Sequence, residues 1–184
     1  MYGDNGADLV KGGLGNDTMY GGSGNDILYG QEDNDILYGK DQNDFLTGAK
    51  GLDTLKGGKG NDIFSFDMYA PFEQNVFGQD VIVDFGNGND RIRLDKTTFD
   101  KISSAAGAGF SDSSDFIVTE LSSSIQNVEA VIVFDQATKA LYYNENGSQP
   151  GLGDGGIIAN FGDGVTPATT IVSSLDASNF IIAN

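Results

Sequence analysis

The sequence predicts an all-β protein, a right-handed parallel β-roll followed by a β-rich C-terminal cap. From Gly3 to Ser65 the chain repeats every nine residues without a gap. Its 27 glycines are far above the usual share, while there are only three prolines. Each repeat also ends in a short run of β-branched, aromatic or aliphatic residues that reads as a strand. A short fixed period of this kind indicates a solenoid whose units bury their apolar side chains against one another.

The seven repeats share three fixed positions. They read GDNGADLVK, GGLGNDTMY, GGSGNDILY, GQEDNDILY, GKDQNDFLT, GAKGLDTLK and GGKGNDIFS. Glycine stands at position one of all seven. Position six holds Asp8, Asp17, Asp26, Asp35, Asp44, Asp53 and Asp62. Position eight holds Val10, Met19, Leu28, Leu37, Leu46, Leu55 and Phe64.

These positions have separate physical roles. Glycines at positions one, two and four are expected to form tight turns through positive-φ conformations. Side chains alternate along a strand, so positions six and eight share one face. Because position eight is apolar, that face must point inward, and the aspartate must point inward with it.

Two nonapeptides make one coil with a strand on each side, so each repeat is expected to stack on the repeat two places later. The aspartates then form two columns, Asp8, Asp26, Asp44 and Asp62 on one side and Asp17, Asp35 and Asp53 on the other. Carboxylates stacked at the strand spacing would repel by ~3.5 kcal/mol per neighbouring pair at an effective dielectric near 20. A divalent cation between turns reverses that repulsion, with turn carbonyls as further ligands. The alternative is a metal-free solenoid in which aspartate only forms turns.

Composition excludes several function classes. The net charge is −17, from 27 acidic and 10 basic residues, which argues against nucleic acid and anionic membrane surfaces as partners. Cysteine and histidine are absent, which excludes disulfides, Cys/His zinc sites, Ser-His-Asp triads and HExxH metalloproteases. No apolar run approaches the ~20 residues of a membrane span. The ligands present in quantity are oxygens, which suit Ca²⁺ or Mg²⁺.

The repeats resemble the RTX, or haemolysin-type, calcium-binding nonapeptide GGxGxDxUx. This resemblance implies a calcium-filled β-roll from the C-terminal region of a type I secreted protein, similar to serralysin-type proteases and to the R-modules of alginate epimerases. It also implies about five ions in the roll. Each ion lies between positions two, four and six of one turn and positions one, three and six of the turn two repeats later.

Carried over to this sequence, the resemblance implies five ligand sets. They are Asp4, Gly6 and Asp8 with Gly21, Ser23 and Asp26; Gly13, Gly15 and Asp17 with Gly30, Glu32 and Asp35; Gly22, Gly24 and Asp26 with Gly39, Asp41 and Asp44; Gln31, Asp33 and Asp35 with Gly48, Lys50 and Asp53; and Lys40, Gln42 and Asp44 with Gly57, Lys59 and Asp62. Most of the ligands other than aspartate are expected to be backbone carbonyls, so that backbone conformation matters more than side-chain identity.

The pattern weakens in the middle and again after Ser65. Position four is Asp33 in the fourth repeat and Gln42 in the fifth. Glutamine tolerates a left-handed conformation poorly, so the Gln42 turn is predicted to be the weakest. Residues 75–83 and 85–93 still fit the nonapeptide frame, and the segment DVIVDFGNGNDRIRL resembles the one that closes the roll in serralysin-type proteins. A further ion is predicted between two groups of residues, Gly58, Gly60 and Asp62 with Asn75, Phe77 and Asp80.

We expect a roll over residues 1–95 and a capping domain over residues 96–184. Residues 96–126 show a weak helical or mixed pattern, and strands are predicted at residues 130–134, 140–143 and 156–161. The ending, residues 179–184, resembles the terminus of a type I secretion signal and also reads as a last strand of the cap. The repeat pattern already runs at the first residues, with no basic and apolar leader, so we expect a segment of a longer protein.

The function predicted first is that of a non-catalytic module that folds on binding Ca²⁺ after export. Its partners would be calcium ions and the type I (ABC) secretion machinery, and its location extracellular or at the cell surface. The alternative is a calcium-dependent adhesive, S-layer or polysaccharide-binding module that also self-associates. Tyr20 and Tyr38 on one outer face and Tyr29 on the other would be its glycan stripe, or simply exposed strand aromatics. Catalysis is disfavoured because the aspartates are equally spaced, whereas a catalytic carboxylate pair is unique; a protease, lipase or epimerase domain would lie upstream in the parent.

Overall fold

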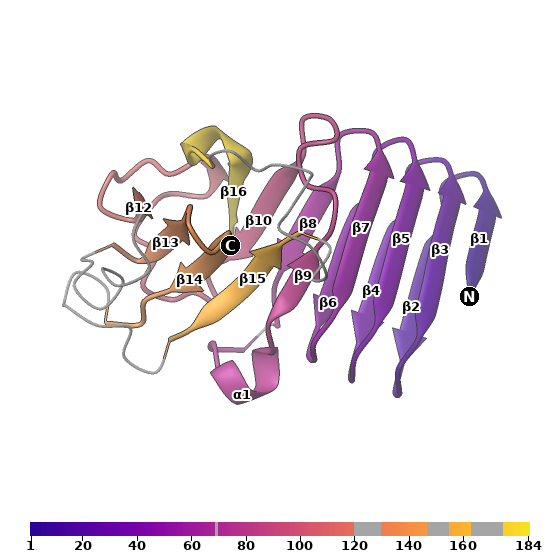
Figure 1. Ribbon diagram of the computed structural model, residues 1–184, viewed down its shortest axis with the longest axis horizontal. Coiled ribbons are helices and arrows are strands. Elements are labelled where there is room, and N and C mark those ends of the chain that lie inside the picture. The colour runs from indigo at the N-terminus through magenta and orange to yellow at the C-terminus, as the bar shows by residue number, and fades with distance from the viewer. Residues whose placement is uncertain (69, 120–129, 147–154, 163–174) are drawn as a thin grey trace.

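Two parallel sheets form the first half of the molecule. The computed structural model describes residues 1–68, 70–119, 130–146, 155–162 and 175–184. Its first eight strands alternate between the sheets: β1 (Tyr2–Asn5), β3 (Thr18–Ser23), β5 (Ile36–Asp41) and β7 (Thr54–Lys59) in one, and β2 (Leu9–Gly13), β4 (Ile27–Gln31), β6 (Phe45–Ala49) and β8 (Ile63–Phe66) in the other. Tyr2 pairs with Tyr20, and Leu28 pairs with Leu46. Each repeat therefore stacks on the repeat two places later, and the predicted parallel β-roll is confirmed (Figure 1).

The position-eight side chains fill the space between the two sheets. Val10 at the open end is 8% exposed, and the other six have no exposed surface. Burying a side chain of this size contributes about 1.5–3 kcal/mol, so this row is a main source of the roll's stability.

After β8 the chain leaves the roll for one excursion. It passes through a short helix, α1 (Gln74–Phe77), and returns as β9 (Asp80–Ile82) and β10 (Arg91–Asp95). β9 pairs with β7, matching Ile82 to Leu55, whereas β10 pairs with β8. The step from Leu55 to Ile82 is 27 residues instead of 18, so the excursion takes up one nonapeptide that contributes no strand to the stack.

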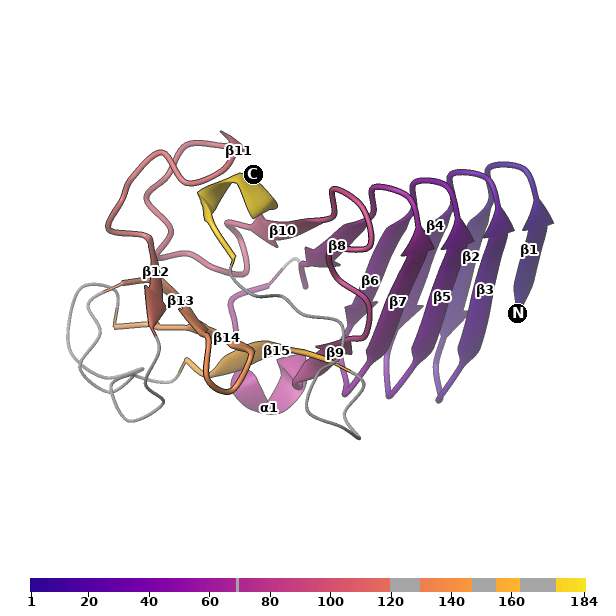
Figure 2. The same cartoon turned by 45° about the horizontal axis from the view of Figure 1, so that its top comes forward.

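The cap continues both sheets beyond the roll (Figure 2). In one sheet β9 is followed by β15 (Ile157–Phe161), β14 (Ala140–Tyr143), β13 (Ile132–Asp135) and β12 (Phe116–Thr119). In the other, β10 is followed by β16 (Phe180–Ala183) and β11 (Gly107–Ala108), with a 3₁₀ helix, η2 (Ala177–Asn179), just before β16. The strand predicted at residues 140–143 is confirmed, and those at 130–134 and 156–161 begin two residues and one residue late. The described residues between 96 and 119 form turns and the strands β11 and β12, and residues 120–126 of the weakly helical segment lie outside the described residues.

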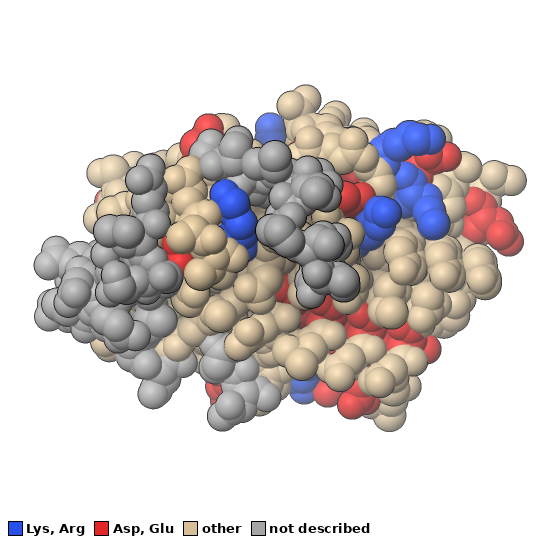
Figure 3. Space-filling model, in the orientation of Figure 1, with Lys and Arg blue, Asp and Glu red and all other residues tan. Residues whose placement is uncertain are grey.

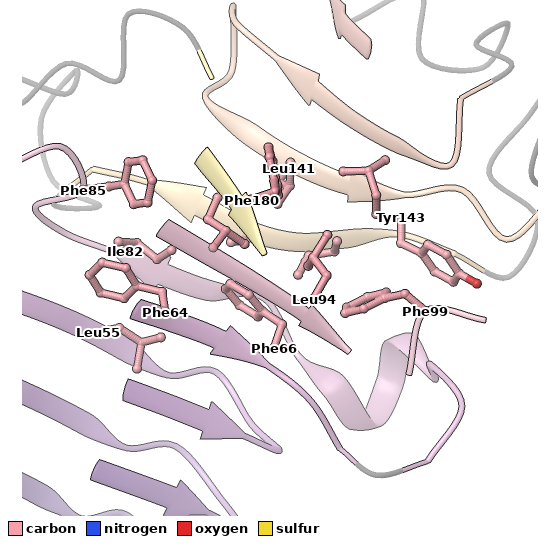
Figure 4. Close-up of a cluster of buried hydrophobic side chains, with 14 of the residues drawn as sticks. Leu55, Phe64, Phe66, Ile82, Phe85, Leu94, Phe99, Leu141, Tyr143 and Phe180 are labelled. Atoms are coloured by element: carbon pink, nitrogen blue, oxygen red, sulfur yellow. The ribbon is translucent and has the colours of Figure 1, made fainter. Parts of the chain in front are cut away.

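One apolar core joins the roll to the cap. Figure 4 shows Phe64 and Phe66 of the roll in one buried cluster with Phe180 and Leu141 of the cap. The same cluster of buried residues extends from Val10 to Ile182. The cap thus covers the apolar end that an open solenoid would expose to water. The division at residue 95 stays a prediction, since both sheets run across it. Within the described residues, no helix has the length and apolarity to cross a bilayer.

Candidate metal centre

The position-six aspartates form two hydrogen-bonded columns. Each backbone N–H donates to Oδ1 of the aspartate one coil further on, as from Asp26 to Asp44 at 2.8 Å and from Asp35 to Asp53 at 2.7 Å. The five aspartates from Asp26 to Asp62 are buried, and Asp8 and Asp17 at the open end are partly exposed. The predicted inward orientation and the two predicted columns are therefore present in the structure.

The second oxygen of each of these carboxylates has no partner. Oδ2 is buried and makes no hydrogen bond in all seven, namely Asp8, Asp17, Asp26, Asp35, Asp44, Asp53 and Asp62. Leaving a buried charged oxygen unpaired costs more than leaving a neutral one, and proteins rarely do so. Seven such atoms at one repeat position indicate a ligand that the polypeptide itself does not supply.

Glycine at position one keeps this region open. A Cβ on Gly39 would collide with Oδ2 of Asp44 and would lie 2.6 Å from the carbonyl oxygen of Gly57 in the next coil. A Cβ on each of the other position-one glycines would lie 3.0 Å or less from Oδ2 of its own aspartate, and none of these glycines has a positive φ. The expectation of positive φ at position one was wrong, because the constraint there is close approach of a carboxylate and a carbonyl oxygen.

Positions two and four are the positive-φ positions. All fourteen of them have φ between 72° and 147°, including Asp4, Gln31, Asp33, Lys40, Gln42 and Ala49. Gln42 has a φ of 77°, so its turn has the shape of its neighbours despite the unfavourable side chain. The carbonyl oxygen of Gln42 lies against the Cα of Gly60 one coil further on. The carbonyl oxygen of Gln42 therefore faces the turn one coil further on, and the carbonyl ligands stay a prediction.

Replacing Gln42 with glycine should stabilise the roll. A left-handed conformation costs a residue with a Cβ roughly 1–2 kcal/mol, and glycine recovers most of that after its own entropy cost. We expect a gain of about 1 kcal/mol in the free energy of unfolding, measured by urea denaturation in calcium. Asp41→Gly, in the same turn but without a positive φ, should instead lose stability. A loss in Gln42→Gly would contradict the assigned strain.

Several turn carbonyls already accept backbone hydrogen bonds. The N–H of Gly6 donates to the carbonyl of Ser23 at 2.7 Å, and that of Lys50 donates to the carbonyl of Gln31 at 3.0 Å. A carbonyl oxygen has a second lone pair, so these contacts leave an acceptor position on each. They also hold successive turns in register.

Position five carries a second ladder that the sequence reasoning missed. The N–H of Asn43 donates to Oδ1 of Asn25 at 3.1 Å, and the N–H of Asn61 donates to Oδ1 of Asn43 at 2.8 Å. The other turn edge repeats the arrangement between Asn34 and Asn16. These bonds point toward earlier coils, whereas the aspartate bonds point toward later ones. The sequence feature that could have predicted this ladder is the Asn-Asp pair that recurs at positions five and six in five of the seven repeats.

The turns after the excursion correct the predicted sixth ligand set. The N–H of Asp53 donates to Oδ1 of Asp80, and the N–H of Asp62 donates to Oδ1 of Asp90 at 2.9 Å. Asp80 therefore extends the column of Asp53, and Gly58, Gly60 and Asp62 do not face Asn75, Phe77 and Asp80. The looped-out nonapeptide moved the following repeat to the other column. Asn75 and Phe77 also lie in α1 rather than in a glycine turn, and Phe77 belongs to the core.

Asp84 is a further carboxylate at this closing turn. Its two oxygens accept the N–H groups of Gly57 at 3.0 Å and Gly58 at 2.9 Å. At Gly3, Gly12, Gly21, Gly30 and Gly39 a glycine carbonyl of the next coil is among the three atoms nearest to an added Cβ, whereas at Gly57 all three nearest atoms belong to Asp62. The sequence feature that could have predicted this carboxylate is the one-residue slip between the nonapeptide frames of residues 75–83 and 85–93, because it leaves Asp84 as an extra residue.

Burial and like charge raise the carboxylate pKa values. Desolvation is the main cause, and it raises the pKa of Asp44 and that of Asp53 to about 7 and that of Asp62 to about 6. Neighbouring aspartates add to the shift: Asp62 and Asp26 act on Asp44, and Asp90 and Asp84 act on Asp62. The columns are therefore costly to ionise unless a cation is present.

This gives a pH dependence of opposite sign with and without calcium. The folded pKa values lie above the unfolded value of 3.8, so the metal-free fold gains stability below about pH 4 and loses it as pH rises through 6 to 7. We expect calcium-stripped protein to show more strand signal by circular dichroism at pH 5 than at pH 8. Calcium-loaded protein should have a higher melting temperature at pH 8 than at pH 5, because protons compete for the same oxygens. Equal strand signal of the calcium-stripped protein at the two pH values would contradict the cause assigned here.

The outer faces carry aromatic and basic side chains. Tyr2, Tyr20 and Tyr38 stack with ring centroids 4.8 and 4.9 Å apart, and the ammonium of Lys40 lies 4.9 Å from the Tyr38 centroid. Because these tyrosines stack on one another, they cover the ring faces that a sugar would otherwise contact. Basic side chains gather at the upper right of the roll and acidic ones show along its lower edge (Figure 3).

The comparisons with known proteins can be placed on this geometry. Residues 2–37 and 38–67 match the family model of the RTX calcium-binding nonapeptide repeat (4 copies). Residues 2–67 are RTX repeats. No curated protein matches the chain. Among solved structures, the solution structure of the AlgE6R3 subunit of the Azotobacter vinelandii mannuronan C5-epimerase is 23% identical, covers 97% of this chain and 80% of its own, and has a TM-score of 0.37.

The RTX repeats make the roll a calcium-binding module. Carboxylate and carbonyl oxygens are the ligands that Ca²⁺ prefers, and the unpaired Oδ2 atoms with the adjacent turn carbonyls provide both kinds. Within the described residues, no group of three or more acidic side chains is placed to hold a metal ion by itself.

Proposed function

We propose that this chain is a non-catalytic RTX module that folds on binding Ca²⁺ outside the cell and so supports the secretion, folding and stability of a longer parent protein. The observation that carries this proposal is the set of seven buried, unpaired Oδ2 atoms in two columns. Their mutual repulsion opposes folding, and bound calcium supplies the positive charge that offsets it.

The ligand sets follow the stacked turns. The five sets implied by the RTX resemblance involve turns one coil apart in the seven repeats. We propose a sixth that joins Ala49, Gly51 and Asp53 to the turn ending at Asp80. The seventh joins Gly58, Gly60 and Asp62 to the turn that holds Asp84 and Asp90. The hydrogen bonds of Asp53 with Asp80 and of Asp62 with Asp90 support these pairings.

Export follows from the same charge balance. In a calcium-poor cytosol the aspartate columns repel and the glycine-rich turns gain entropy by staying open, so the chain suits passage through a type I secretion channel. Outside the cell, calcium near the millimolar level fills sites with Kd of roughly 10⁻⁴–10⁻³ M. Calcium ions and the secretion machinery are then the partners, and any chemistry belongs to another domain of the parent.

Circular dichroism tests this proposal. Protein in chelator should show little strand signal, and adding Ca²⁺ should restore it in a steep, cooperative transition. Magnesium is the matched control: it demands near-ideal octahedral geometry and gives up its water reluctantly, so it should act only weakly. Chelated protein that is already rich in β-structure would rule out the coupling of folding to calcium.

A further inference from the structure

The Asn-Asp pair at positions five and six forms a reciprocal ring with the same pair one coil further on. The N–H of Asn43 donates to Oδ1 of Asn25 at 3.1 Å, and the N–H of Asp26 donates to Oδ1 of Asp44 at 2.8 Å. Each pair therefore gives the other one side-chain acceptor and one backbone donor, as the two partners of a helix capping box do. All five position-five asparagines accept such a bond, namely Asn16, Asn25, Asn34, Asn43 and Asn61.

The two bonds of a ring lie in different surroundings. The bond between Asp26 and Asp44 is buried, whereas the asparagine side chains are exposed at the edge of the turn. A hydrogen bond that competes with water adds little stability by itself. The asparagine bond does tie the backbone of Asn43 to the earlier coil, one residue before the Asp44 carboxylate. The backbone and the carboxylate of Asp44 are thus both held against the coil that would share the ion.

This arrangement leaves one carboxylate oxygen in a fixed place. Oδ1 of Asp44 is occupied by the N–H of Asp26, and Oδ2 stays buried beside Gly39 without a hydrogen-bond partner. An oxygen that is already held in position loses less conformational entropy when an ion binds to it. The exposed asparagine can therefore act on calcium affinity without touching the ion.

Two repeats lack the asparagine and provide a comparison within the chain. Position five is Ala7 in the first repeat and Leu52 in the sixth, and neither side chain can accept a hydrogen bond. The column bond beside Leu52, from the N–H of Asp53 to Asp80, is 3.1 Å long. It is the longest of the seven position-six bonds in the described columns, and the five bonds that belong to complete rings measure 2.7–2.9 Å.

We propose that the position-five asparagine is a positioning residue for calcium, which holds the aspartate of the next coil in the orientation that binds the ion. This inference rests on the proposed function of the aspartate columns. Sites with a complete ring bind calcium more tightly than the two sites beside Ala7 and Leu52. The ions at those two sites are the first to leave when calcium is withdrawn.

Asn43→Ala tests the role of a complete ring. It removes the acceptor of the Asn61 N–H, a bond of 2.8 Å, and leaves every proposed ligand in place. The chain has no cysteine or histidine, so ¹¹³Cd²⁺ would bind through oxygen ligands and report each site by NMR. One cadmium signal should shift or broaden while the others stay. In stopped-flow mixing with a chelator, one calcium ion should leave roughly 3- to 10-fold faster than from the wild type. An unchanged spectrum and unchanged release would overturn the proposal.

Two further variants separate positioning from structural support. Asn43→Asp keeps an acceptor for the Asn61 N–H, so it should release calcium no faster than the wild type. Phe45→Ala shortens a half-buried side chain on the outer face of the same repeat. It should lower the melting temperature and leave all cadmium signals in place. If Phe45→Ala changed one cadmium signal as Asn43→Ala does, the asparagine would be a structural residue only.

Leu52→Asn is the converse test, and it decides the question if Asn43→Ala does not fold. Leu52 is 58% exposed, so the turn can accept the change, and the new side chain would offer an acceptor to the N–H of Gln79, just before Asp80. One calcium ion should leave roughly 2- to 5-fold more slowly, whereas Leu52→Ala should show no such gain. If the wild type folds on calcium and Leu52→Asn releases its ions at the wild-type rate, this inference alone fails. If the wild type binds no calcium, the proposed function fails with it.

Discussion

Asp44→Asn should change stability in opposite directions with and without calcium. In calcium the variant should unfold more easily, and its calcium midpoint should rise about 10- to 100-fold, because two proposed sites lose a charged ligand. In chelator at pH 8 it should retain more strand signal than the wild type, because a buried charge between Asp26 and Asp62 is gone. Circular dichroism measures the calcium midpoint and the signal left in chelator, and thermal melts in calcium measure the loss of stability.

The choice of asparagine makes this result decisive. Its Oδ1 can still accept the N–H of Asp26, so the 2.8 Å bond of the column is kept while Oδ2 is replaced by a donor. Glu73→Gln removes one negative charge from an exposed side chain outside the proposed ligand sets, and it should leave the calcium midpoint nearly unchanged. If Asp44→Asn destabilised the protein equally in both buffers, the carboxylate would be a structural group rather than a calcium ligand.

Gly39→Ala should be among the most damaging single methyl additions in the roll. The new Cβ meets the Asp44 carboxylate and lies 2.6 Å from the carbonyl oxygen of Gly57, and both atoms are held by the stacked coils. We expect a loss of about 3 kcal/mol in the free energy of unfolding, together with weaker calcium binding, because both displaced oxygens are proposed ligands. Urea denaturation at saturating calcium and a calcium titration measure these losses.

Gly15→Ala is the matched control for that variant. Gly15 has a φ of 92° and open space around its Cα, so only the backbone conformation opposes a Cβ there. The cost should be about 1 kcal/mol with little change in calcium binding. If Gly39→Ala cost no more than Gly15→Ala, then close approach would not be the reason for glycine at position one.

The period of nine residues was enough to predict the stacking, the inward aspartates and the buried row from Val10 to Phe64. Each follows from strand alternation and from the need to bury position eight. The reason for glycine at position one was not predictable in the same way, because it depends on a carboxylate folding back onto its own turn. The asparagine ladder was missed because position five was read only as part of a turn.

The pairing of the closing turns failed for a different physical reason. A frame count assumes that every nonapeptide contributes a strand, and it assigned Asp80 to the column of Asp62. The chain instead places one nonapeptide outside the stack, in the excursion through α1, and local residue propensities do not predict such an excursion. The cap was recognised by its strands at residues 140–143 and 156–161, whereas the joining of β16 to β10 is a long-range contact that a single sequence does not reveal.

The excursion after β8 also bears on how such a chain changes length during evolution. Asp80 bonds to Asp53 and Asp90 bonds to Asp62 although a nonapeptide is skipped between them. The two parallel sheets of the roll have the same pattern of apolar and acidic positions, so a repeat can stack on either sheet. A nonapeptide that leaves the stack, half a coil, therefore still allows the aspartates that follow it to bond with the column they reach, so the roll can tolerate a change of length by nine residues at such an excursion.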